Sequence, residues 1–183
     1  VLHSGYLLPV QARWYTEELH GTGRTEMVSA SWEPEMHRFH RVHLTENECV
    51  TMLSSAYLSP AGWTSGSGIA LDCAEEAPLH AGHMDMTWQD TDTVYYFFGR
   101  VDDPYIASLR VGFWRETPSG RREVLSLDTS REEWPEREGR TYFLLRQPPF
   151  VWLADWGEMH AFLAAYDREG RVVMELDDIP DGA

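Results

Sequence analysis

The strongest constraint on the fold is a run of short segments in which apolar and polar residues alternate, with turn-forming residues every 8–12 positions. Residues 107–113 alternate in this way and lead into the turn 117–120, Thr-Pro-Ser-Gly. Near the end of the chain, residues 160–166 and 171–176 flank the turn 167–170, whose Gly170 suits a left-handed conformation. About ten such segments predict an all-β chain folded as an antiparallel, immunoglobulin-like β-sandwich. An α+β arrangement with one or two peripheral helices is the alternative.

The pattern also predicts a central strand, a hairpin and two loops. Residues 93–101 are apolar on both faces, which is typical of a central strand. Residues 36–44 and 49–57 read as the two strands of a hairpin joined by a polar turn. The Gly- and Ser-rich stretch 60–68 reads as a loop, and a second loop is predicted over 74–82.

The first 22 residues have a different pattern. Val10, Trp14 and Leu19 fall near one stripe, with Pro9 before them and Gly21 just beyond, so a short N-terminal helix is predicted. We therefore divide the chain into an N-terminal appendage, 1–22, and a β-sandwich domain, 23–183. A further subdivision into a hairpin subdomain, 23–68, and a sandwich, 69–183, is also consistent with the pattern.

The charge composition excludes several classes of function. The 183 residues include 30 acidic groups against 15 basic ones, all of them Arg, for a net charge of -15. Such a charge repels phosphate backbones, so a nucleic-acid partner is not expected. Without Lys the chain has no Schiff-base nucleophile and no P-loop lysine. The carboxylates are spread along the chain, which is typical of a solvated surface.

The second half of the chain resembles a family of uncharacterised bacterial cell-envelope proteins, often lipoproteins, that carry an immunoglobulin-like sandwich. The resemblance rests on Phe98–Val101, on Asp103–Ile106 and on the closing segment Ala165–Val173, and it covers about 80 of the residues from Val94 to Leu176. It implies an extracytoplasmic location, either secreted or anchored through a removed N-terminal segment. It carries over no catalytic residue. The two cysteines depart from the pattern of these proteins.

The two cysteines are Cys49 and Cys73. In an exported protein they can pair and close a loop, and the alternative is that they are two buried free thiols. The sequence leaves both alternatives open. No apolar stretch approaches the roughly 20 residues that a membrane span needs, and the chain begins with Val1, as it would after removal of a signal peptide, an anchor or a tag.

Histidines supply the candidate metal ligands. His80, His83 and Asp85 form a His-x-x-His-x-Asp set that suits Fe, Mn or Zn, with His160 as a distant additional ligand. His37, His40 and His43 cannot converge on one ion if they lie on a strand, because His40 then faces away from the other two. No dedicated cofactor is expected, and any Ca²⁺ or Zn²⁺ would be adventitious.

The eight tryptophans supply the candidate binding residues. Trp32, Trp88 and Trp114 occupy predicted strands, where core packing explains them. Four others fall in predicted loops, where exposed rings would stack on sugars or dock on a protein; these are Trp63, Trp134, Trp152 and Trp156. The competing interpretation of segment 150–156 is a loop that plugs one end of the sandwich.

Three functions follow from these observations. The leading hypothesis is a non-enzymatic extracytoplasmic domain that binds or scaffolds a protein or glycan of the cell envelope, because no catalytic motif is present. The second is a carbohydrate-binding or glycan-active domain that uses the loop tryptophans. The third is a metal-dependent enzyme that uses His80, His83 and Asp85. The sequence does not indicate an oligomeric state.

Overall fold

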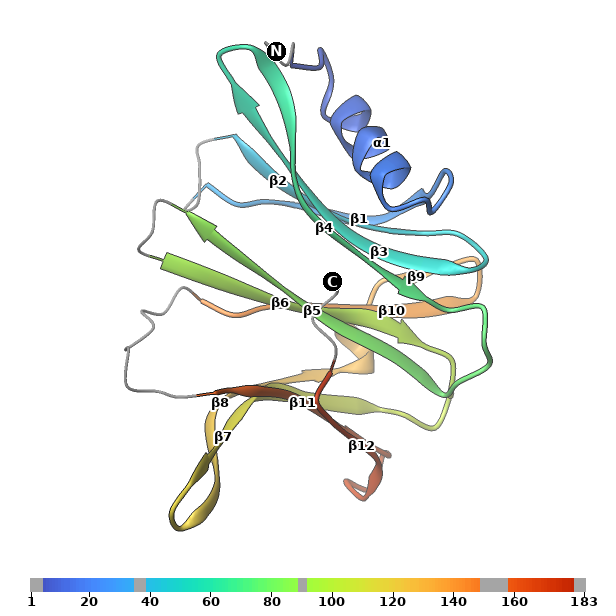
Figure 1. Cartoon of the computed structure of the whole chain (residues 1–183). Coiled ribbons are helices and arrows are strands. Elements are labelled where there is room, and N and C mark those ends of the chain that lie inside the picture. The colour runs from blue at the N-terminus through green and yellow to red at the C-terminus, as the bar shows by residue number, and fades with distance from the viewer. Residues whose placement is uncertain (1–4, 35–38, 89–91, 149–157, 180–183) are drawn as a thin grey trace. The chain divides into compact units, whose positions relative to one another are not determined.

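The computed structural model of the chain describes residues 5–34, 39–88, 92–148 and 158–179 (Figure 1). It is built from three antiparallel four-stranded sheets and one α-helix, which confirms the predicted all-β class with a short N-terminal helix. The chain divides into two compact units, Val1–Glu76 and Ala77–Ala183. The helix belongs to the first unit together with a complete sheet of its own.

Unit 1 consists of helix α1 and one meander sheet with the strand order β1-β2-β3-β4. The elements are α1 (Pro9–Leu19), β1 (Glu26–Trp32), β2 (His40–Glu46), β3 (Val50–Ser59) and β4 (Gly62–Asp72). Pro9 begins the helix, and the side-chain oxygen of Gln11 accepts a hydrogen bond from the Leu8 N–H. At the other end Gly21 has φ of 64°, while Thr22 N–H donates to the Glu17 carbonyl and Gly21 N–H to the Glu18 carbonyl. These two bonds form a Schellman motif that ends the helix.

Strand β4 corrects the loop predicted over residues 60–68. Its small residues are required because α1 packs against β4 at one position and a β3 side chain fills the space at another. A Cβ atom on Gly68 would lie 2.5 Å from Thr16 Cγ2 of the helix, and one on Gly66 would collide with the Ser55 hydroxyl. The Gly and Ser content that is typical of a loop therefore reflects close packing on a strand.

Unit 2 is a sandwich of two sheets, with strand orders β5-β6-β10-β9 and β12-β11-β7-β8. The elements are β5 (Leu79–Trp88), β6 (Asp92–Val101), β7 (Ser108–Thr117), β8 (Gly120–Ser130), β9 (Glu136–Arg137), β10 (Arg140–Arg146), β11 (His160–Tyr166) and β12 (Val172–Asp177). Lettered along the chain, these sheets are A-B-E-D and G-F-C-C′, the order of an immunoglobulin-like domain. Strand β6, predicted as central, lies between β5 and β10.

The core of unit 2 lies between its two sheets. Phe97 of β6, Phe113 of β7 and Leu163 of β11 belong to one buried cluster, and the Phe97 and Phe113 rings are 5.2 Å apart. Immunoglobulin domains often link the B and F strands by a disulfide at this position. Both cysteines of the chain lie in unit 1, so no disulfide joins the two sheets of unit 2, and aromatic and aliphatic side chains fill the space between them.

Candidate functional site

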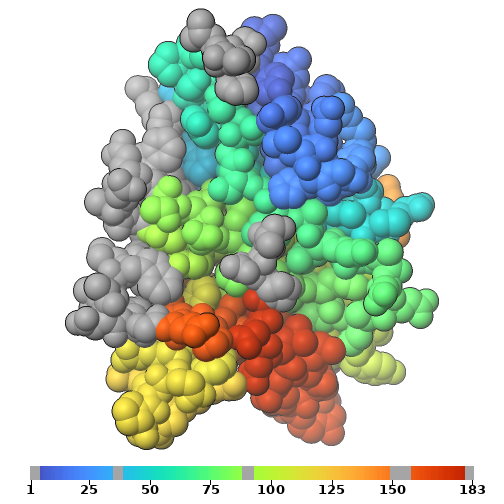
Figure 2. Space-filling model, in the orientation of Figure 1, coloured from blue at the N-terminus to red at the C-terminus, as the bar shows by residue number. Residues whose placement is uncertain are grey.

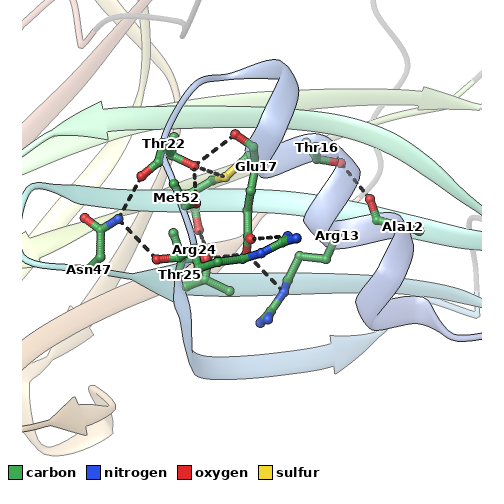
Figure 3. A network of polar contacts seen from close by, with 11 residues as sticks. Ala12, Arg13, Thr16, Glu17, Thr22, Arg24, Thr25, Asn47 and Met52 are labelled. Atoms are coloured by element: carbon green, nitrogen blue, oxygen red, sulfur yellow. Dashed lines mark hydrogen bonds and ion pairs between the residues drawn. The ribbon is translucent and has the colours of Figure 1, made fainter.

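A buried ionic network holds α1 on its sheet and thereby determines which part of the sheet stays uncovered (Figure 3). The Glu17 carboxylate accepts a hydrogen bond from the Thr25 hydroxyl at 2.6 Å and pairs with Arg13 Nε at 3.2 Å and Arg24 Nη1 at 3.4 Å. Glu17 and Arg13 are both buried. Burial lowers the pKa of Arg13, and the nearby Glu17 opposes that shift. The network fixes the C-terminal half of the helix and the start of β1.

Beyond the N-terminus of the helix, aromatic side chains gather on the helix-bearing face of the sheet. The backbone of Tyr6 forms two hydrogen bonds with Trp63, each 2.7 Å long, so this segment extends the β4 edge. The close approach depends on Gly62, which has φ of 118°, because a Cβ there would lie 2.7 Å from the Tyr6 carbonyl. The Tyr6 ring in turn contacts that of Tyr15 on α1, with centroids 6.1 Å apart.

The same face continues across the sheet to its edge strand. Trp32, at the end of β1, lies 6.1 Å from Trp63 between ring centroids, with the rings inclined by 50°. Arg41, opposite Trp32 in the β1–β2 register, places its guanidinium 5.3 Å from the Trp32 ring. Phe39 N-terminal to β2 is exposed, and its carbonyl accepts a hydrogen bond from Leu58 N–H. We call this group the aromatic surface; it comprises Tyr6, Tyr15, Trp32, Phe39, Arg41 and Trp63.

The aromatic surface contains one predicted binding residue, Trp63, and one residue that the sequence pattern assigned to the core. Trp32 is 54% exposed, because α1 packs on β3 and β4 and leaves the β1 edge open. The signal in the sequence was its position at the last residue of a strand, just before Glu33 and Pro34. Trp63 lies on β4, not in a loop.

Trp134, another of the predicted binding tryptophans, does not join this surface. Trp134 is 6% exposed and packs in the core of unit 2, with its indole N–H donating to the Thr129 hydroxyl at 3.0 Å. A single 3-10 turn, Arg131–Glu133, folds it inward. Trp152 and Trp156 lie outside the described residues, as does the rest of the aromatic segment 150–156.

The structure separates the predicted metal ligands. Strand β5 begins at Leu79, so its alternation places His83 and Asp85 on one face and His80 on the other. The His83 ring packs against Phe97 in a tilted contact and against Phe113 in an edge-to-face contact, whereas His80 Nε2 lies 3.6 Å from Asp102 Oδ2. Among the described residues, no group of three or more His, Cys, Asp or Glu side chains could hold a metal ion.

The remaining histidine candidates that the structure describes occupy separate sites. His40 and His43 are on opposite faces of β2, as predicted, but both are buried where a half-exposed hairpin was expected. Burial, reinforced by Arg41, Arg13 and His40, lowers the pKa of His43 to about 3. His160 stacks on Trp114 and pairs with Asp178 at 2.7 Å. His37 lies outside the described residues.

A second candidate is a hollow of about 460 Å³ on the outer face of the β12-β11-β7-β8 sheet. In Figure 2 the β7–β8 hairpin (yellow) and the β11–β12 hairpin (orange to red) lie side by side. Four of the hollow's charged groups already pair with one another, Arg110 with Glu123 at 2.7 Å and Arg121 with Asp177 at 2.9 Å. Arg121 also covers the Trp114 ring at 3.7 Å. Because these charged groups already pair with one another, the hollow is a weaker candidate for a binding site than the aromatic surface.

Comparisons of the chain with known protein families, with curated proteins and with solved structures find no match. The resemblance to bacterial envelope proteins thus remains a prediction from strand and turn patterns. Within the described residues, no helix is long and apolar enough to cross a membrane; α1 has 11 residues.

Proposed function

We propose that the chain is a non-enzymatic binding module that docks a protein partner through the aromatic surface of unit 1. One observation carries the proposal: of the eleven large apolar side chains exposed in the described residues, eight lie in unit 1. Three of the eight, Tyr15, Trp32 and Phe39, belong to the aromatic surface, and the other five are Leu7, Leu8, Trp14, Leu19 and Met27. Exposed apolar surface concentrated in this way is typical of an interaction site.

The chemistry of this surface favours a protein over a glycan. Trp, Tyr, Phe, Met and Arg are the residues enriched in protein interfaces, and Trp–Arg groups such as Trp32 with Arg41 are frequent hot spots. Exposed aliphatic side chains, which suit a protein partner better than a sugar, accompany the aromatic residues of unit 1 at Leu7, Leu8 and Leu19. The Trp32 and Trp63 rings are also inclined to each other and do not form one flat platform.

The envelope location is part of the same proposal and rests on the resemblance of the second half of the chain. Fractionation of cells that express the complete native gene with a C-terminal epitope tests it. Recovery with the envelope or medium supports the location, and recovery only with the cytoplasm contradicts it.

Selection of displayed peptides on the purified protein tests the binding surface. We expect the enriched peptides to be apolar and amphipathic. We then measure the affinity of a synthetic version of the selected peptide by calorimetry. It should bind the Trp32→Ala variant at least about tenfold more weakly than the wild type. Tyr105→Ala is the matched control, because Tyr105 is an exposed aromatic residue (77%) of unit 2; its affinity should equal that of the wild type.

A glycan array on the same three proteins separates the alternatives. Glycan binding that Trp32→Ala abolishes, without peptide binding, would replace the protein partner by a glycan. Binding that survives Trp32→Ala, or the absence of a ligand in both screens, contradicts the proposed site.

A further inference from the structure

Two cysteines face each other at the point where β3 begins and β4 ends. Val50 pairs with Asp72 in the β3–β4 register, so the next position outward places Cys49 opposite Cys73. The Cys73 N–H donates to the Cys49 carbonyl at 2.6 Å, which continues the ladder by one step. Directly opposite residues of an antiparallel pair have Cα atoms about 4.5–5.5 Å apart and side chains on the same face. Disulfides span Cα separations of about 4.4–6.8 Å, so residues that are opposite in such a ladder lie within the range that a disulfide bridges.

The two thiols differ in access. Both residues are thiols in the structure, with Cys49 exposed and Cys73 buried. The Cys73 Sγ lies 3.5 Å from the hydroxyl of Thr51. Cys49 directly precedes β3 and Thr51 is two residues further along, so continued alternation places both side chains on the same face. The buried sulfur therefore lies on the side of the sheet that carries the exposed cysteine.

From this arrangement we propose that Cys49 and Cys73 form a thiol modification site that closes to a cross-strand disulfide on reaction with a disulfide-bearing oxidant. The Cys49 thiolate attacks one sulfur of the oxidant RSSR, forming a mixed disulfide and releasing RS⁻. The Cys73 sulfur, after losing its proton, then attacks the Cys49 sulfur and displaces the second RS⁻. Two protein thiols and RSSR thus become one protein disulfide and two RSH.

The turn that carries Cys49 is already tied to the helix connection. Asn47 accepts hydrogen bonds from Cys49 N–H and Val50 N–H, and its amide donates to the Thr22 and Arg24 carbonyls at 2.9 and 3.4 Å. Arg24 in turn pairs with Glu17. Closing the disulfide adds a covalent link from this turn to the end of β4, so the oxidised protein should resist unfolding better than the reduced one.

Incubation of the folded wild type with glutathione disulfide tests the site. We expect a product two hydrogens lighter than the reduced protein, with peptide mapping that joins Cys49 to Cys73. Its Tm should exceed that of the reduced form by several degrees, roughly 5–10 °C. Dithiothreitol should reverse both changes.

Two single variants complete the test. In Cys73→Ala the reaction should stop at a stable glutathione adduct on Cys49. In Cys49→Ser we expect no adduct and no rise in Tm. Because Cys73 is buried, Cys49→Ser is the variant that remains informative if Cys73→Ala folds poorly. The proposal is overturned if oxidised wild type carries only a mixed disulfide or an intermolecular dimer, or if the internal bond forms only in urea. None of these measurements depends on the partner.

Discussion

The two units bury their apolar side chains in different ways. Unit 2 encloses its apolar side chains between two sheets and carries paired charges outside, such as Arg110 with Glu123 and Arg171 with Asp167. Unit 1 has one sheet and one 11-residue helix on the face that carries the aromatic surface. A single short helix does not cover a face of four strands, so the part beside β1 stays exposed. Unit 2 therefore buries its apolar core by itself, whereas unit 1 keeps an exposed apolar face that a ligand can cover.

We expect the largest difference in stability between two substitutions that each remove one aromatic side chain, one from each unit. Phe97→Ala removes a ring that is fully buried in the unit 2 core, and we expect it to lower the free energy of unfolding by about 3–5 kcal/mol. Trp32→Ala removes an exposed ring of unit 1 and should cost under about 0.5 kcal/mol. Urea unfolding followed by circular dichroism measures both. A similar cost for the two would show that Trp32 supports the fold and would undermine the comparison.

The next effect concerns the ionic network of unit 1. Glu17→Ala leaves Arg13 buried without its main counter-charge, which should destabilise the protein by about 3 kcal/mol. Arg13→Met combined with Glu17→Leu removes both charges and should recover most of that loss. Arg110→Met at the exposed Arg110–Glu123 pair is the matched change in unit 2 and should cost under about 1 kcal/mol. A double variant as unstable as Glu17→Ala would show that the loss does not come from the unpaired charge of Arg13.

A pH profile tests burial beneath the helix. His43 is 2% exposed, and its pKa in the folded protein is about 3, below the ordinary value of 6.5. His43 therefore becomes protonated near pH 6.5 in the unfolded chain but only near pH 3 in the folded protein. Below pH 6.5 the free energy of unfolding should fall by up to about 1.4 kcal/mol per pH unit through this residue. His43→Gln should flatten that slope between pH 6.5 and 4.5, and an unchanged slope would contradict the assignment.

The smallest expected effect lies at the junction of the N-terminal segment with β4. Gly62→Ala introduces a side chain at φ of 118° and against the Tyr6 carbonyl, so we expect a loss of about 1–3 kcal/mol. The Tyr6–Trp63 bridge should open, and peptide affinity should fall together with stability. Gly120→Ala, at φ of 104° with open space around it, is the control for backbone strain alone. Equal effects at both positions would show that the contact with Tyr6 is unimportant.

The sequence predicted the elements whose signal is local and failed where packing decides. Residues 93–101 were recognisable as a central strand because they are apolar on both faces, and α1 because Pro9 and Gly21 bound it. Residues 62–68 were misread, because the need for Gly68 comes from Thr16 on a distant segment. Alternation along a strand does not reveal which face a helix covers, so the sequence signal for the exposure of Trp32 was limited to its place at the strand end. The separation of His80 from His83 needed only the correct start of β5.

Indole signals in a ¹H–¹⁵N correlation spectrum test the central claim most directly, because each tryptophan side chain reports its own contacts. Titration with the selected peptide should shift the Trp32 and Trp63 indole signals and leave those of Trp114 and Trp134, in unit 2, unchanged. Assignment by single Trp→Phe variants identifies each signal. Shifts confined to Trp114 or Trp134 would place binding on the sandwich and contradict the account.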